Sequence, residues 1–196
     1  MKRMFLPSFI LLICTLVIAI IPTDAEGKIY SDTLRLHILA GSDSREDQEM
    51  KIEIRDRLLK KYGSLLSESE SIDEALSLSN SLLSDMESDI NAWLCELGSD
   101  AGATVTLTEE WYDTRVYEDF TLPKGYYKSL RVIIGEGDGQ NWWCVMYPPL
   151  CLDLSLENAP ADDGILDYSK EEVRLISGGG YNVKFKLLEI ISDIFS

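Results

Sequence analysis

The longest periodic pattern in the chain is helical and covers residues 72–97, where apolar side chains recur every three or four positions. The segment at residues 71–74, S-I-D-E, has the spacing of a helix-capping box, and Gly98 stands where a helix C-cap is expected. The pattern therefore predicts one long helix. Its buried stripe is typical of a protein core and not of a cofactor site.

A shorter helix is predicted directly after the turn at residues 41–44. Ser44 and Asp47 have the capping-box spacing, with Ser44 as the N-cap and Asp47 reaching back to it. The helical pattern then continues to about Tyr62. The simplest role of Asp43 and Asp47 is therefore to shape the turn and to cap this helix.

Residues 33–40 alternate between the two faces of a strand that precedes this turn. Leu34, Leu36 and Ile38 share one face, and His37 lies on the other. We therefore expect a half-buried strand with His37 on its less buried face.

Strand periodicity returns after the long helix, over residues 103–108, 115–120, 126–134 and 141–147. Short turns separate these segments, which predicts two neighbouring hairpins, one of them closed by the glycine-rich residues 135–139. The acidic residues of that loop would repel phosphate, so it is not predicted to be a phosphate-binding loop.

Together these patterns predict an α+β fold in a single domain. We expect an antiparallel sheet packed against the two N-terminal helices and against a C-terminal helix over residues 183–195. The domain would cover residues 28–196, with a variable C-terminal segment at residues 153–196.

The segment at residues 141–151, N-W-W-C-V-M-Y-P-P-L-C, is far richer in aromatic residues than the 9% of the whole chain. Adjacent strand residues point to opposite faces, so we expect one of Trp142 and Trp143 to be buried and the other to be available. The two prolines that follow Tyr147 would end the strand there.

Cys144 and Cys151 bracket this turn with six residues between them. A disulfide across so short a loop would stabilise the fold by about 2–3 kcal/mol. The segment would then be either a stapled turn with a core tryptophan or a rigid aromatic ridge that binds a partner. A glycan-binding aromatic face is a third alternative.

The N-terminus has the pattern of a secretory signal peptide. The basic residues Lys2 and Arg3 follow the initiator Met1, and an apolar run covers residues 4–21. Cleavage is predicted after Ala25 or Gly27, which makes residues 1–27 the signal peptide. The alternative is an uncleaved membrane anchor. In both cases the rest of the chain lies outside the cytoplasm.

The charge and the His and Cys content of the chain limit the classes of partner and cofactor that it can bind. The chain has 18 basic and 34 acidic residues, a net charge of −16, so nucleic acid and anionic lipid are poor partners and a basic protein surface is a better one. His37 is the only histidine and the cysteines lack zinc spacing, so we expect no metal and no cofactor. Cys95, on the long helix, is predicted to be a buried free thiol.

Several ordered motifs between residues 33 and 152 resemble the stage II sporulation protein R family of endospore-forming bacteria. They are L-R-L-H-I-L-A-G-S-D-S at residues 34–44, D-Q at 47–48, R-D at 55–56, P-x-G-x-Y at 123–127, L-R-V at 130–132, Gly135, and N-W-W-C-V-x-Y-P-P-L-C at 141–151. Gly41 stands where the family usually has Asn, and Tyr147 where it usually has Phe. Neither difference removes a charge or a cysteine. The resemblance is specific because it spans residues 33–152 in the same order and ends in a long, unusual motif.

This resemblance implies a signalling protein that the forespore secretes into the space between the forespore and mother-cell membranes. Proteins of the family trigger a membrane-embedded aspartic-type protease of the mother cell, which then processes the precursor of the early mother-cell sigma factor. The expected protein is not an enzyme and has no small-molecule substrate. We expect the surface that binds the protease to be formed by the strand-turn-helix unit at residues 33–62 together with the stapled tryptophan segment. The residues expected to bind the partner are Trp142, Trp143, Tyr147, His37, Asp43 and Asp47.

The alternative is a secreted cysteine hydrolase in which Cys144 is the nucleophile, His37 the base and Asp43 the group that orients the ring. A disulfide between Cys144 and Cys151 would exclude it, because a disulfide sulfur is not a nucleophile.

Overall fold

The computed structural model describes residues 24–117 and 120–149, with residues 7, 9, 10, 12–14, 173 and 176 from the segments that flank them. The predicted C-terminal helix, Cys151 and most of the predicted signal peptide lie outside the described residues. Within the described part of the chain, no helix is both long enough and apolar enough to cross a membrane.

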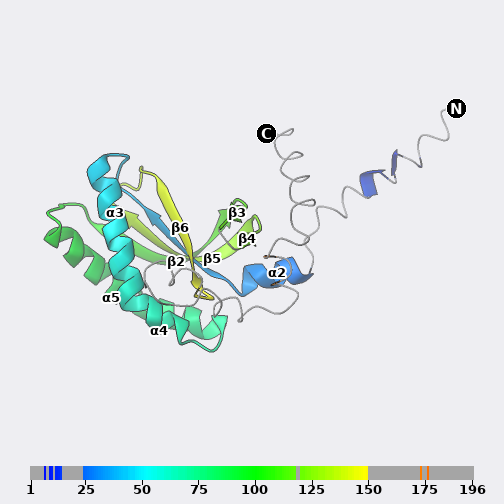
Figure 1. Cartoon of the computed structure of the whole chain (residues 1–196), viewed down its shortest axis with the longest axis horizontal. Helices are drawn as coiled ribbons and strands as arrows, with labels where there is room; N and C mark the ends of the chain where they lie inside the picture. Colours follow the sequence, from blue (N-terminus) through cyan, green and yellow to red (C-terminus); the bar gives the residue numbers. More distant parts are fainter. Residues whose placement is uncertain are drawn as a thin grey trace.

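The fold is α+β, as the sequence predicts, and forms a single domain with a mostly antiparallel sheet (Figure 1). The elements in chain order are α2 (Asp24–Ser31), β1 (Leu34–Leu39), α3 (Arg45–Leu58), the π-helical turn η1 (Leu59–Gly63), α4 (Ser64–Ser67), α5 (Ile72–Glu96), β2 (Ala103–Tyr112), β3 (Arg115–Val116), β4 (Thr121–Leu122), β5 (Gly125–Ile134) and β6 (Asn141–Tyr147).

The four-stranded sheet has the order β2-β5-β1-β6, which differs from the predicted pair of hairpins. β2 and β5 pair in antiparallel fashion, but β5 and β6 are not neighbours, because β1 lies between them. β1 runs parallel to β5 and antiparallel to β6. Residues 135–139 therefore connect two strands across β1 and do not close a hairpin.

The central place of β1 also overturns the expectation of a half-buried strand. Leu34, Leu36 and Ile38 are fully buried, as predicted, but Arg35 is fully buried as well and His37 is only 9% exposed. A strand that pairs with a neighbour on each side and has other residues packed on both of its faces has no solvent-exposed face.

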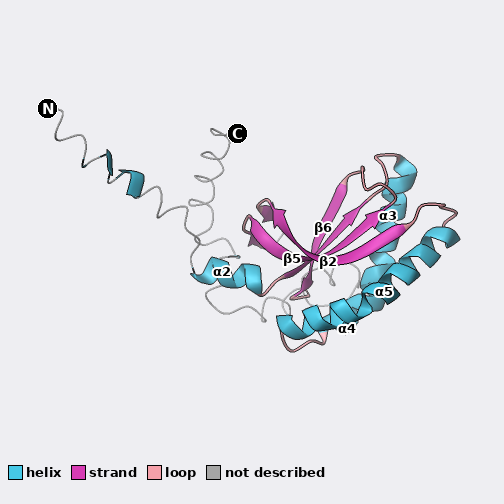
Figure 2. Cartoon of the chain, turned by 180° about the vertical axis from the view of Figure 1, so that it is seen from behind, coloured by secondary structure: helices cyan, strands magenta, loops and turns pink. Residues whose placement is uncertain are grey.

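The helices α3, α4 and α5 lie on one side of the sheet, and α2 lies at one end of it (Figures 1 and 2). The buried stripe of α5, which contains Ala75, Met86, Ile90 and Leu94, contributes to the same core as the apolar face of β1. The other face of the sheet is met by side chains of the β3–β4 hairpin, which occupies the region predicted as one strand at residues 115–120.

Both predicted N-cap serines accept the expected backbone hydrogen bond, but the return hydrogen bond of the capping box does not form. Ser44 accepts a hydrogen bond from the backbone N–H of Asp47, and Ser71 accepts one from Glu74. The acidic residue does not reach back in either case: Asp47 accepts from the Ser42 hydroxyl, and Glu74 accepts from the backbone N–H of Glu70. The helix predicted to end near Tyr62 begins as α3 and continues through the π-helical turn η1 into α4.

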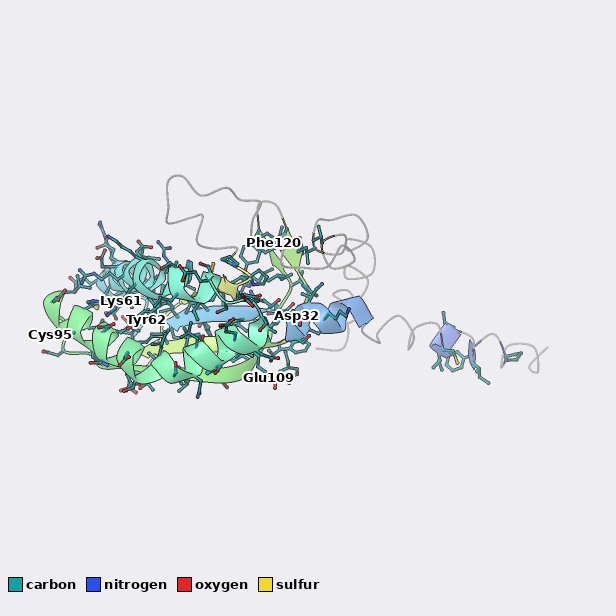
Figure 3. All side chains as sticks on the ribbon, turned by 90° about the horizontal axis from the view of Figure 1, so that it is seen from below. Asp32, Lys61, Tyr62, Cys95, Glu109 and Phe120 are labelled. Carbon is teal, nitrogen blue, oxygen red and sulfur yellow. The ribbon has the colours of Figure 1, made fainter. Side chains whose placement is uncertain are left out.

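The prediction that Cys95 is buried is wrong. Cys95 is a free and exposed thiol, and Figure 3 shows it near the end of α5 at the periphery of the molecule. Its neighbour Leu94 is fully buried. Consecutive helical residues point about 100° apart, so the residue next to a core position turns away from the sheet.

Candidate functional site

The sheet face opposite the helices carries a connected set of polar and aromatic side chains centred on His37. Its Nδ1 atom lies 3.1 Å from Oε2 of Glu110, and its Nε2 atom lies 2.9 Å from Oδ1 of Asn141. These residues come from β1, β2 and β6. Both ring nitrogens of His37 therefore have a hydrogen-bond partner within this cluster.

Glu110 is the carboxylate of this cluster and is 16% exposed. Burial alone would raise the pKa of Glu110, but hydrogen bonds from His37 and Ser129, with the charges of His37 and Arg131, outweigh it and lower the pKa. The Nε atom of Arg131 lies 3.3 Å from the other carboxylate oxygen. Glu110 is thus held as an anion between the His37 ring and the Arg131 guanidinium.

Arg35 lies on the same face and is enclosed by aromatic rings. Its Cζ atom is 3.9 Å from the centre of the Tyr112 ring and 5.0 Å from that of Tyr127. Nη2 donates to the Tyr117 hydroxyl at 3.0 Å, whereas Nε and Nη1 are buried without a hydrogen-bond partner. Burial also raises the pKa of Tyr112, so that phenol stays neutral beside the guanidinium. Among the residues that the structure describes, Arg35 is held by ring faces and one hydroxyl and by no carboxylate.

The two tryptophans do not form one ridge. Trp143 stacks on His37, with ring centres 5.6 Å apart, and the Cζ atom of Arg115 lies 3.8 Å above the Trp143 ring. Trp142 points to the helix side, where Arg55 of α3 lies 5.0 Å from its ring. Both tryptophans are half-buried, and both pack against the core.

Tyr147 is only 6% exposed and ends β6, as the sequence predicts. The following peptide bond to Pro148 is cis. Tyr147 is therefore one of the buried residues at the end of the sheet. The partner-binding role predicted for the two tryptophans, Tyr147 and His37 remains a prediction.

Asp43 and Asp47 lie away from His37, in a network that joins the turn before α3 to the loop before β6. The backbone N–H of Gln140 donates to Oδ1 of Asp43 at 2.7 Å. Lys51, 4% exposed, donates to the carbonyl of Gln140 at 2.7 Å. Burial lowers the pKa of Lys51, and the charge of Asp43 opposes that effect. Asp47 accepts a hydrogen bond from the Ser42 hydroxyl of the same turn. Both aspartates thus contact the turn, and their predicted partner-binding role remains a prediction.

The geometry does not assemble the predicted pair of Cys144 and His37. Cys144 is opposite Leu36 in the β1–β6 register, whereas His37 is opposite Trp143, so the two side chains point to opposite faces of the sheet. Cys144 is 1% exposed and disulfide-bonded. Cys151 lies outside the described residues, so its pairing with Cys144 remains a prediction.

Three residues of this face were not predicted as site residues from the sequence: Glu110, Arg35 and Asn141. Glu110 lies in a segment that has no counterpart in the family motifs, and its nearness to His37 depends on the strand order. One signal was available for Arg35, because a charged residue lay within the apolar run at residues 34–40. Among the described residues, no group of three or more His, Cys, Asp or Glu side chains is placed to hold a metal ion.

A family model described as "Stage II sporulation protein R" matches residues 30–156, which include every element from β1 to β6. The chain belongs to the stage II sporulation protein R family. Within the family, the chain is 32% identical over 187 residues to "Stage II sporulation protein R" of Bacillus subtilis (strain 168), in a match that covers 86% of this chain and 84% of the relative. No solved structure matches the chain.

Family membership supports a role in sporulation. It also agrees with the geometry, since the family motifs coincide with structural parts of this fold. The motif at residues 34–44 forms the central strand and its turn, and the motif at residues 141–151 begins with the strand that pairs with it. The family motifs thus contribute His37, Arg35, Asn141 and Trp143 to this face, whereas Glu110 comes from outside the motifs.

Proposed function

We propose that this protein is a secreted sporulation signal that activates a membrane-embedded aspartic-type protease of the mother cell and thereby starts processing of the early mother-cell sigma factor precursor. The forespore would export it into the space between the two membranes. The N-terminal pattern at residues 1–27 supports this route, whether the segment is cleaved or retained as an anchor.

The arrangement around His37 is the observation that supports a binding role over a catalytic role. Both of its nitrogens already have acceptor partners, Glu110 and Asn141. Cys144, the nucleophile of the alternative hydrolase, lies on the opposite face of the sheet and is disulfide-bonded. A general base needs a free nitrogen within hydrogen-bond reach of its nucleophile. The arrangement favours a rigid surface over an active site.

A ligand of this kind activates its receptor by binding the active state more tightly than the inactive one. The acidic surface, with a net charge of −16, suits basic residues on the extracytoplasmic side of the protease. The rigid sheet lowers the entropic cost of binding, because its side chains are already ordered.

Reconstitution tests this proposal directly. The protease is placed in proteoliposomes with the sigma factor precursor, and the purified protein is added on the extracytoplasmic side. We expect precursor cleavage to rise with protein concentration and to saturate, and we expect no cleavage by the protein alone. Equal cleavage with and without the protein would overturn the proposal, and cleavage by the protein alone would show that it is itself a protease.

The same question can be asked in sporulating cells of the native host. Deletion of the gene should leave the sigma factor precursor unprocessed, as seen on an immunoblot, and should strongly lower the number of heat-resistant spores. A copy without residues 4–21 should not restore processing, because the protein would not be exported. Normal processing in the deletion strain would contradict the proposed role.

A further inference from the structure

The outer edge of β2 is divided into a sealed half and an open half. β2 is the outermost of the described strands of the sheet, so no described strand pairs with one side of its backbone. At its start, Asn91 of α5 bonds to both the N–H and the carbonyl of Ala103, at 2.8 and 3.0 Å, and Glu87 accepts from the N–H of Val105 at 2.9 Å. Side chains of α5 therefore occupy the first backbone groups of this edge.

These bonds also establish which later groups face outward. Backbone groups of alternate residues point to the same side of a strand, so Leu107, Glu109 and Trp111 present theirs on the same side as Ala103 and Val105. Within the described part of the chain, no side chain bonds to the outward groups of these three residues. An unpaired edge of this kind can accept another strand.

Exposed aromatic side chains lie beside the open half. Trp111 is 54% exposed and Tyr126 is 60% exposed. They are cross-strand partners on β2 and β5, with ring centres 5.2 Å apart in an edge-to-face arrangement. Neither ring packs in the core. Exposed Trp and Tyr next to unpaired backbone groups are typical of surfaces that bind peptides.

The charges next to this edge indicate what kind of chain it accepts. Glu109 is 56% exposed, lies between Leu107 and Trp111, and within the described region makes a single, long ion pair, with Lys128 at 3.6 Å. Figure 3 shows Glu109 at the border of the molecule. A second copy of this chain would bring a second Glu109 and a second net charge of −16 to the interface, which disfavours self-pairing.

We infer that the open half of β2, residues Leu107 to Trp111, binds an extended segment of the partner protein by strand addition. The segment carries at least one basic residue that meets Glu109 and one apolar side chain that packs on the Trp111–Tyr126 pair. This inference rests on the proposed function, because the partner it names is the extracytoplasmic part of the membrane-embedded protease.

The test uses two substitutions of the same exposed residue. Glu109→Pro removes the outward N–H and blocks the edge with the proline ring, while no internal hydrogen bond is lost. Glu109→Ala keeps the N–H and is the matched control for the backbone. Trp111→Ala removes the aromatic contact, and Val116→Ser is its control, since Val116 is a 79% exposed apolar residue of the neighbouring hairpin.

Affinity is measured on the full exported protein with the detergent-solubilised protease as the probe, and circular dichroism checks that each variant is folded. We expect Glu109→Pro and Trp111→Ala to weaken binding at least tenfold. Glu109→Ala should weaken it only a few-fold through the lost charge, and Val116→Ser should bind like the wild type. In the complex, the amides of Leu107, Glu109 and Trp111 should gain protection from hydrogen exchange.

The outcomes separate this inference from the proposed function. If the wild type binds and activates the protease but Trp111→Ala and a folded Glu109→Pro bind equally well, the docking edge is wrong and the proposed function stands. If the wild type neither binds nor activates the protease, both fall. A dimer in sedimentation experiments that Glu109→Pro disrupts would replace the partner by a second copy. Binding to phosphatidylglycerol vesicles through Trp111 would replace it by a membrane.

Discussion

The Nδ1 atom of His37 lies 3.1 Å from Oε2 of Glu110, although β1 and β2 are not neighbours and β5 runs between them. The two side chains meet across the face of β5, beside Ser129 and Arg131. This contact ties the first strand of the domain to a strand more than seventy residues later. It therefore helps to hold the sheet order that places β1 at the centre.

Glu110→Gln is expected to lower the free energy of unfolding at pH 7 by about 1–2 kcal/mol, because it removes a charged acceptor for His37. The pKa of Glu110 is lowered in the folded protein, so its carboxylate stabilises the fold above about pH 4.3 and loses this effect as the pH falls through the folded-state pKa. The difference between wild type and variant should thus be full at pH 7 and shrink toward pH 3. Urea unfolding at several pH values measures it.

Glu109→Gln is the control for that series. Glu109 lies on the same strand, but it is 56% exposed and its ion pair is long. We expect a change close to zero at every pH, because exposed ion pairs contribute little. A loss that is equal for both variants, or that does not depend on pH for Glu110→Gln, would contradict the role assigned to Glu110.

Arg35→Met is expected to change the free energy of unfolding by less than about 1 kcal/mol, or to increase it. Arg35 is fully buried, pairs with no carboxylate among the described residues, and leaves Nε and Nη1 without acceptors. Replacing such a group by an apolar chain of similar length removes the cost of its desolvation. Thermal unfolding checks this.

The comparison variant at this position is Arg35→Ala, which leaves a cavity between Tyr112 and Tyr127 and should cost about 2–5 kcal/mol. If Arg35→Met is as unstable as Arg35→Ala, the contacts of the guanidinium with the tyrosine rings outweigh its unsatisfied atoms, and our account of Arg35 is wrong.

Gly139→Ala is expected to destabilise the protein by about 1–3 kcal/mol. The backbone of Gly139 approaches the turn before α3 so closely that an added Cβ atom would lie 2.3 Å from the carbonyl oxygen of Ser42. Its own N–H donates to the carbonyl of Ala40 at 2.9 Å. The methyl group would push apart the two loops that Asp43 and Lys51 hold together. Chemical unfolding of the variant gives the value.

Gly102→Ala is the matched control, since an added Cβ atom there meets only Oδ1 of Asn91, at an ordinary 3.7 Å. Its unfolding free energy should stay within about 1 kcal/mol of the wild type. If both alanine variants behave alike, the close approach at Gly139 is not what restricts that position to glycine.

Alkylation of the folded, exported protein should modify Cys95 and leave Cys144 unmodified. Cys95 is exposed and free, whereas Cys144 is buried and disulfide-bonded. Peptide mass spectrometry then identifies the partner of Cys144, which we predict to be Cys151, and the same spectrum shows whether the signal peptide is removed. Rapid alkylation of Cys144 near neutral pH would overturn the disulfide and reopen the hydrolase alternative.

The local pattern of residues determined the elements that depend on neighbours in sequence. The helix from Ile72 to Glu96, its cap at Ser71 and its end at Gly98 follow from a 3.6-residue period and from side-chain oxygens that satisfy the first backbone donors. The first strand and the end of β6 at Tyr147 follow equally from alternation and from the prolines. The family, too, could be predicted from the sequence, because its motifs occur there in the expected order.

Tertiary structure alone decided which strands lie side by side. Turn residues indicate where a chain reverses, but they do not exclude a third strand from the gap, and β1 lies between β5 and β6. That one placement buries Arg35, brings Glu110 to His37 and puts Cys144 on the face away from His37. Contacts between residues far apart in sequence depend on the packing of the whole sheet, and no local period encodes that packing.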